Sequence, residues 1–195
     1  MKHWFVLTLI SIVGSSYLLG QKLSDTVQYV SLEQALKMPA NEVKALDLSK
    51  SRFHNIPDTI QLFINLERLK LTKNKITELP DFFKSFNELR YIYLDKNKFT
   101  VFPYQLFHLS NLKYIDISRN KFTAIPQGIK SLEKLVHLDV WNTRITSLPS
   151  ELKELKELRY LDVRGTTFSP SFVEKWTTSM PETVIKFDRP CDCLE

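Results

Sequence analysis

Apolar residues recur along most of the chain with a period of 23 residues. The first position of the repeat falls on Val43, Leu66, Leu89, Leu112, Leu135 and Leu158. The first, fourth and sixth positions of each copy are apolar, and the residues between them are mostly polar. Alternation with a period of two predicts a short strand whose apolar side chains all point to one side. Residues 43–168 are therefore expected to repeat one strand and one return segment in six copies, the last of them partial.

Prolines mark the return segment of each copy. The fifteenth position holds Pro57, Pro80, Pro103, Pro126 and Pro149. Proline fixes φ and lacks an N–H donor, so it starts a segment that leaves the strand. The short remainder of each copy fits a 3₁₀ turn or a very short helix. Successive strands should then stack as a parallel sheet over one continuous core, in an α/β solenoid.

A column of asparagines stands where the chain turns off the strand. The ninth position is asparagine in the second, third and fourth copies: Asn74, Asn97 and Asn120. A buried amide at this point can satisfy backbone groups of the neighbouring coils, which an interior turn would otherwise leave without partners. We expect these three side chains to form a structural ladder through the solenoid.

The first 42 residues precede the repeats. Residues 1–20 combine Lys2, an apolar run and small residues, a pattern typical of a secretory signal peptide. The run is shorter than the roughly 20 apolar residues that span a bilayer, so no stable membrane insertion is expected after cleavage. A retained N-terminal anchor is the alternative. Residues 21–42 should hold an N-terminal segment and a capping helix, since Ser31-Leu-Glu-Gln34 is a capping-box pattern and Pro39 stops a helix.

Residues 169–195 are expected to form the C-terminal cap and a tail. Ser169 followed by Pro170 predicts the start of a helix. Phe172 and Trp176 lie on one face of that helix, where they can close the open end of the core. A final strand is expected shortly before the tail. This cap and the N-terminal one would shield both ends of the solenoid from water.

The repeat resembles the 23-residue class of leucine-rich repeats, L-x-x-L-x-L-x-x-N-x-L-x-x-L-P-x-x-I-x-x-L-x-x. The second copy, residues 66–88, carries this pattern from Leu66 through Asn74 and Pro80 to Phe86. The N-terminal pattern, with Ser-Leu-Glu-Gln-Ala-Leu at 31–36, is similar to small secreted bacterial proteins of this class. The resemblance implies a horseshoe arc that binds a ligand, often a host or envelope protein, on its concave sheet. It also implies a secreted, periplasmic or cell-surface location.

The third, fifth and seventh positions of each copy should face outward on that concave sheet. Neighbouring strands lie about 4.8 Å apart, so side chains at these positions would gather on one face. The expected ligand-binding residues are Tyr91, Tyr93, Tyr114, Asp116, His137, Asp139, Trp141, Tyr160 and Asp162. Tyrosine and tryptophan supply most interface hot spots. The alternative is that the stacked rings only stabilise the sheet through cross-strand contacts.

Three aspartates occupy the fifth position of successive copies. Asp116, Asp139 and Asp162 would repel one another unless their charges are compensated. Arg164 can neutralise the charge of Asp162, and His137 can compensate the charge of Asp116 or Asp139. One interpretation is an acidic pocket for a partner's lysine or arginine; the other is that aspartate is an ordinary residue of this repeat. No metal site is predicted, because three carboxylates on a flat sheet do not enclose an ion.

The eighth and tenth positions form a basic rim along one edge of the sheet. They hold Lys50, Arg52, Lys73, Lys75, Lys96, Lys98, Arg119, Lys121 and Arg144. The rim carries no acid and concentrates much of the positive charge of a chain whose net charge is +5. It could attract a polyanion such as a sulfated glycan, or it could be a solvated edge that keeps the protein soluble. Nucleic acid is not an expected partner of an exported protein.

Few residues could support catalysis or hold a cofactor. The four glycines are not clustered, which excludes the glycine-rich cradles of nucleotide-binding enzymes. Ser118, His137 and Asp139 come nearest to a catalytic triad, but they lack an oxyanion hole and a closed cleft. Cys191 and Cys193 are too close for an unstrained bridge, so a free pair and a bond to another chain both remain open.

These observations predict a monomeric, non-catalytic scaffold without a cofactor that binds a protein ligand on its concave face. Polyanion binding through the basic rim is one alternative. A purely structural envelope protein without a specific ligand is the other.

Overall fold

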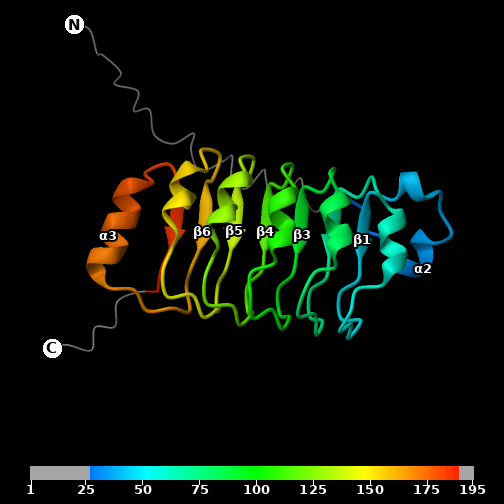
Figure 1. The fold of residues 1–195 in the computed structure, drawn as a ribbon, viewed down its shortest axis with the longest axis horizontal. Helices are drawn as coiled ribbons and strands as arrows, with labels where there is room; N and C mark the ends of the chain where they lie inside the picture. The colour runs from blue at the N-terminus through cyan, green and yellow to red at the C-terminus, as the bar shows by residue number, and fades with distance from the viewer. Residues whose placement is uncertain (1–26, 189–195) are drawn as a thin grey trace, which may run out of the picture.

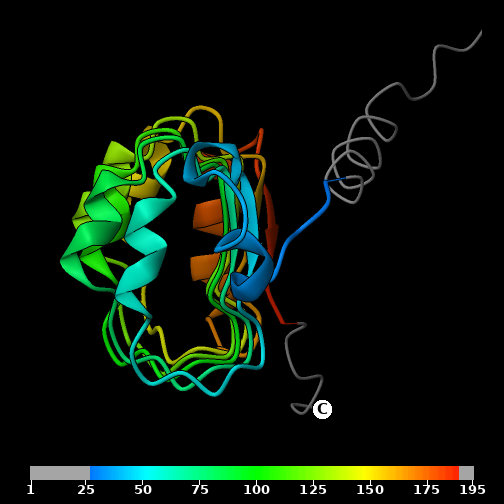
Figure 2. The same ribbon diagram turned by 90° about the vertical axis from the view of Figure 1, so that its right-hand side faces the viewer.

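The computed structural model describes residues 27–188. The expected signal peptide at 1–20 and the two tail cysteines lie outside this range. Within it, each repeat forms one short strand and one turn, and the coils follow one another in a single row (Figure 1). Along the row, the strands make one wall of the coil and the turns make the opposite wall (Figure 2). The predicted solenoid is confirmed.

Seven parallel strands form one open sheet whose order follows the chain. The strands are β1 (Ala45–Asp47), β2 (Arg68–Lys70), β3 (Tyr91–Tyr93), β4 (Tyr114–Asp116), β5 (His137–Asp139), β6 (Tyr160–Asp162) and β7 (Val184–Lys186). The register aligns equal positions of successive copies, as where Leu69 pairs with Ile92 and Ile92 with Ile115. Side chains at the third and fifth positions therefore form straight columns across the outward face of the sheet.

A 3₁₀ turn follows each proline of the fifteenth position. The turns are η2 (Asp58–Leu62), η3 (Asp81–Ser85), η4 (Tyr104–His108), η5 (Gln127–Ser131) and η6 (Ser150–Glu154). In η3, the carbonyl of Pro80 accepts the N–H of Phe83 at 3.1 Å, which closes a 3₁₀ turn directly after the proline. The prolines thus start the return segment as predicted.

The core lies between the sheet and the 3₁₀ turns. Every residue at the first, fourth and sixth positions of the six repeats is buried, and Leu94 in the third copy has no exposed surface. Phenylalanines fill the wider part of the core: the rings of Phe83 and Phe86 meet edge to face with centroids 5.2 Å apart. Each coil therefore buries its apolar side chains mainly against the coils on either side.

The N-terminal cap contains the expected capping box. Helix α2 (Leu32–Ala35) begins after Ser31, whose hydroxyl accepts the N–H of Gln34 while the Gln34 side chain accepts the N–H of Ser31. The helix ends at Ala35, earlier than the expected stop at Pro39. A 3₁₀ turn, η1 (Ala40–Glu42), follows the proline instead.

The C-terminal cap is a helix and a strand, as predicted. Helix α3 (Pro170–Ser179) begins after Ser169, whose hydroxyl accepts the N–H of Phe172. The side chain of Trp176 is buried against the last coil. Helices α2 and α3 lie at opposite ends of the row (Figure 1). No helix within residues 27–188 has the length and apolar character needed to cross a membrane.

Candidate functional site

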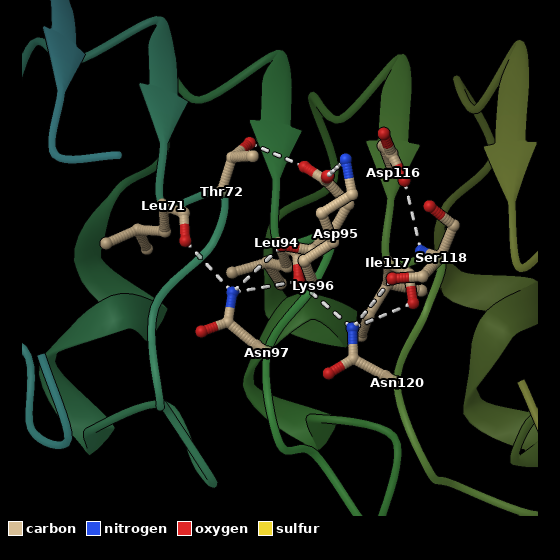
Figure 3. Close-up of polar contacts among 10 residues, drawn as sticks. All are labelled: Leu71, Thr72, Leu94, Asp95, Lys96, Asn97, Asp116, Ile117, Ser118 and Asn120. Atoms are coloured by element: carbon tan, nitrogen blue, oxygen red, sulfur yellow. Dashed lines mark hydrogen bonds and ion pairs between the residues drawn. The ribbon is translucent and has the colours of Figure 1, made fainter. Parts of the chain in front are cut away.

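The three ladder asparagines join successive coils, and Figure 3 shows two of them, Asn97 and Asn120. The amide nitrogen of Asn97 donates to the carbonyls of Leu71 and Leu94 at 2.9 and 3.0 Å. Its amide oxygen accepts a backbone N–H from the preceding coil at 3.1 Å. Asn74 and Asn120 make the same kinds of contact one coil away on either side. This buried network fixes the position of the outward-facing residues that lead into each turn.

The residue before the ninth position has a left-handed backbone in every copy, which was not predicted. The φ values at the eighth position lie between 52° and 88°, at Lys50, Lys73, Lys96, Arg119, Asn142 and Gly165. Glycine and asparagine adopt this conformation readily, whereas other residues strain by roughly 1–2 kcal/mol. A side chain on Gly165 would also collide with the backbone of Asn142, since a Cβ there would lie 2.6 Å from its Cα. With Arg52 at the tenth position of the first copy, where φ is 59°, five basic residues therefore hold a backbone conformation that their residue types do not favour.

The aromatic residues of the third position form a continuous column across β3 to β6. The ring of His137 stacks between those of Tyr114 and Tyr160, with both centroid distances at 4.4 Å. Tyr91 extends the column at 6.3 Å from Tyr114, and Tyr93 joins it from the fifth position at 5.0 Å. These five side chains are half-buried rather than fully exposed, because each ring covers its neighbour. Cross-strand stacking thus covers part of the ring surface that was expected to be free for a ligand.

Trp141 stands apart from this column. Its ring lies between two guanidinium groups, with the Cζ of Arg119 at 4.2 Å and the Cζ of Arg164 at 6.0 Å from ring centroids. The indole is consequently half-buried, not freely exposed as the sequence suggested. Arg119 belongs to the basic rim, so the rim and the concave face meet at this tryptophan.

The three aspartates of the fifth position are aligned by the strand register. One carboxylate oxygen of Asp116, Asp139 and Asp162 accepts the backbone N–H two residues further on, at 3.0, 2.8 and 3.1 Å respectively. Figure 3 shows the first of these bonds, from Ser118 to Asp116. Aspartate therefore satisfies a donor at the end of each of these three strands, which explains why it recurs there.

Arg164 neutralises Asp162 as expected. Its guanidinium bonds both oxygens of the carboxylate, which is almost fully buried, and the Tyr160 hydroxyl donates to the same group. The proposed acidic pocket is thus occupied at this end by the protein's own arginine. A partner's cation can reach only the part of the aspartate column around Asp116 and Asp139.

His137 does not compensate the aspartates, so that expectation is wrong. Burial lowers the pKa of His137 to about 4, and the neutral imidazole serves as a stacking ring at pH 7. Burial also raises the pKa of Asp116, and it raises the pKa of Asp139 to about 7. Nearby carboxylates add to both shifts. Asp139 is therefore a group on this face whose charge changes near neutral pH.

The basic rim lies beside these residues and is mostly exposed. Within residues 27–188, the one ion pair that involves a rim residue joins Lys96 to Asp95, with Nζ and Oδ2 3.8 Å apart. Asp95 also accepts a hydrogen bond from Thr72 (Figure 3). The positive charge of the rim thus remains largely uncompensated. In the same range, no group of three His, Cys, Asp or Glu side chains is arranged to hold a metal ion.

A strand and a 3₁₀ segment that recur every 23 residues, with a ladder of asparagines in the central copies, define a leucine-rich repeat solenoid. The chain is a leucine-rich repeat protein: residues 41–99 match the "Leucine rich repeat" family and residues 103–183 match the "Leucine-rich repeat region" family. This fold generally mediates protein–protein interaction, and its members are typically non-catalytic scaffolds. A comparison with curated proteins finds no match.

Several solved structures share the fold. A leucine-rich repeat protein of Leptospira interrogans is 29% identical, with a TM-score of 0.67 over 75% of this chain and 43% of that one. Internalin C2 of Listeria monocytogenes is 22% identical, with a TM-score of 0.64 over 76% of this chain and 62% of that one. The ectodomain of the Arabidopsis thaliana receptor kinase GASSHO1/SCHENGEN3, solved in complex with CASPARIAN STRIP INTEGRITY FACTOR 2, is 21% identical, with a TM-score of 0.58 over 77% of this chain and 21% of that one. The chain spans less than two thirds of each structure.

Proposed function

We propose that this chain is an exported, non-catalytic scaffold that recognises a protein ligand on its concave face. One observation carries the proposal: Trp141 is held between Arg119 and Arg164 beside the aromatic column. Tryptophan, tyrosine and arginine are the residue types that dominate interface hot spots. Their concentration at one place on the face supports a protein partner over a purely structural role.

The rigidity of the face supports the same proposal. Stacking between Tyr114, His137 and Tyr160 fixes ring orientations before any partner arrives. The strands beneath are fixed in turn by the buried asparagine ladder. A preorganised aromatic surface loses little conformational entropy on binding, so more of the contact energy remains as affinity. Export is supported by the signal-like pattern in residues 1–20.

A pull-down tests this function directly. The chain from residue 21 onward would be used as bait against envelope proteins and host extracellular proteins. A bait with Trp141→Ala should lose the specific partner. The matched control is Tyr104→Ala, which removes an exposed ring from the opposite wall of the solenoid. Equal capture by all three baits would contradict recognition through the concave face.

Polyanion binding through the basic rim is a second candidate function. The observation that favours it is the left-handed backbone of Lys50, Lys73, Lys96 and Arg119. Basic residues stand there at a conformational cost that Asn142 and Gly165 avoid in later copies. Salt separates the two functions, because binding to the rim should weaken steeply with ionic strength while aromatic-centred binding should weaken little.

A further inference from the structure

A groove lies at the N-terminal end of the concave face, where it meets the aromatic column at Tyr93. It is shallow and open, and it is lined by Tyr29, Val30, Ser31, Asp47, Ser49, Lys50, Lys70, Thr72 and Tyr93. The segment before the first repeat builds one of its walls. Val30 forms a parallel bridge with Leu46, in which its N–H donates to Ala45 and its carbonyl accepts from Asp47. This bridge continues the sheet by one residue and places Tyr29 against the groove.

Lys70 provides one of the two positive charges that line the groove, and Lys50 provides the other. Its Nζ lies 3.9 Å from the ring centroid of Tyr29 and 5.6 Å from that of Tyr93. Asp47 is the register partner of Lys70, but its carboxylate accepts the N–H of Ser49. Among the described residues, Lys70 has no ion pair. The ammonium group is thus held by two aromatic faces, an arrangement that leaves its charge available to an incoming anion.

A second cation lies behind the groove with an unused donor. The Nη1 atom of Arg68 is buried and has no hydrogen-bond partner within residues 27–188. The guanidinium stacks on Tyr91, with its Cζ 3.8 Å from the ring centroid. Burial raises the pKa of Tyr29, and the charge of Arg68 and a hydrogen bond with its side chain partly offset that rise, so Nη1 is the buried donor of Arg68 that lacks a partner among the described residues. A buried donor without a partner favours an arrangement in which an acceptor reaches it.

From this geometry we infer that the groove binds a carboxylate from an acidic segment of the protein partner, with Lys70 as the pairing cation. The inference rests on the proposed protein-binding function and names the chemistry at one end of that interface. Lys50 and Lys70 outnumber Asp47 in the groove. Arg68, which interacts with Tyr29, adds a further positive charge beside it. Ser49 and Thr72 line the same space. The two tyrosine walls suit the apolar stem of a glutamate or aspartate side chain better than a densely charged polyanion.

The aspartate column predicts the orientation of a bound partner along the face. Arg68 and Lys70 stand on β2, whereas Asp116, Asp139 and Asp162 end β4, β5 and β6. The N-terminal end of this face therefore carries Arg68 and Lys70. The aspartate column lies toward the other end, on the same strands as Tyr114 and Tyr160, where Asp162 is already paired with Arg164. An acidic segment of the partner would lie over the groove, and any basic segment would lie toward Asp139.

Titration of the full chain with small probes tests this site. The probe is an N-acetylated tetraglutamate amide, and backbone amide shifts of Ser49 and Thr72 report binding by NMR. Tetraglutamate should shift both amides saturably, and Lys70→Gln should weaken the affinity at least ten-fold. Lys130→Gln on η5, which removes an exposed lysine from the opposite wall, should leave it unchanged. Tetraglutamine should not shift the groove.

Three outcomes would overturn the inference. These are an absence of shifts with tetraglutamate, an equal affinity in Lys70→Gln, and a groove that responds to a sulfated disaccharide but not to tetraglutamate. The last outcome would assign the groove to a glycan instead. If this titration fails, the pull-down can still show partner capture that depends on Trp141, so the proposed function would stand. If the pull-down fails, the titration can still show carboxylate binding in the groove. The two experiments therefore test the two proposals independently.

Discussion

The guanidinium of Arg164 covers the carboxylate of Asp162, with Nη2 2.6 Å from one oxygen and Nε 3.0 Å from the other. Asp162 is 1% exposed, so Arg164 is the counter-charge of a buried carboxylate. Removing one partner of such a pair typically costs about 3–5 kcal/mol. Because the Arg164 side chain is half-exposed, we expect Arg164→Ala to lower the free energy of unfolding by about 3 kcal/mol, at the lower end of that range. Urea denaturation at pH 7 measures this change.

A double variant separates the buried charge from lost packing. Asp162→Asn added to Arg164→Ala should recover most of the loss, because the amide oxygen can still accept the backbone N–H at position 164. A double variant no more stable than Arg164→Ala would show that the charge is not the cause.

The asparagine ladder should be a major source of stability. Asn97→Ala removes the donor for Leu71 and Leu94 and the acceptor for Ile76. Each buried polar group left without a partner costs roughly 1–3 kcal/mol, so we expect a total loss of about 3 kcal/mol. Ser51→Ala is the matched control, since this exposed residue holds the ninth position of the first copy and should change stability by less than about 0.5 kcal/mol. Equal urea midpoints for the two variants would contradict the ladder's role.

The repeat register predicts a contrast between two leucines. Leu94 is fully buried at the sixth position, whereas Leu62 in η2 is 57% exposed. Truncating a buried leucine to alanine typically costs about 2–5 kcal/mol, and truncating an exposed one costs little. Leu94→Ala should therefore lower the denaturant midpoint strongly, while Leu62→Ala should barely change it.

The pKa of Asp139 predicts a pH dependence of stability. Burial raises this pKa to about 7, so between about pH 4 and pH 7 the folded chain holds a proton that the unfolded chain releases. The contribution of Asp139 to stability must therefore fall as the pH rises through this window. Asp139→Asn removes that effect and keeps an acceptor for the N–H of Trp141. It should raise the urea midpoint relative to the unaltered chain at pH 8 and change it little at pH 4.

His137 contributes a pH dependence of stability of opposite sign, but it does not affect this comparison. Its pKa is lowered to about 4, so its contribution to stability is lost as the pH falls from about 6.5 toward 4. The histidine is present in both chains, and its effect cancels when they are compared at equal pH. A stability difference that does not grow between pH 4 and pH 8 would contradict the raised pKa of Asp139.

Binding should depend on Trp141 more than on the rim. Once a partner is captured, Trp141→Ala should lower its affinity by about 2 kcal/mol, or roughly thirty-fold. Replacing Lys73, Lys96 and Lys98 by serine should mainly slow association and reduce its salt dependence. Titrations at low and high salt measure both effects. Loss of binding in the lysine variant with no effect of Trp141→Ala would assign the function to the rim.

The sequence predicted those parts of the fold that depend on a repeated pattern. The period of apolar residues placed Leu69 and Ile92 in register, and the prolines placed the 3₁₀ turns. Ser31 and Ser169 marked the two capping helices, because a capping side chain acts on the backbone within three residues of itself. These features arise from contacts that are either local or identical in every copy.

Features that depend on particular side-chain packing could not be predicted in this way. The left-handed backbone at Lys73 follows from the turn geometry, and neither lysine nor arginine signals it. The contact of Tyr29 with Lys70 joins the repeats to a segment outside them. Burial of His137 between two rings, which suppresses its charge, depends on the rotamers of three neighbouring strands.

The asparagine ladder also bears on how such a chain can change in length during evolution. The bonds of Asn74, Asn97 and Asn120 to the preceding coil all span 26 residues on the donor side and 21 on the acceptor side. Duplicating or deleting one whole 23-residue copy would recreate each of these bonds with an equivalent residue. Duplication can therefore lengthen the recognition surface in whole coils and deletion can shorten it, while a change of any other length would break the ladder.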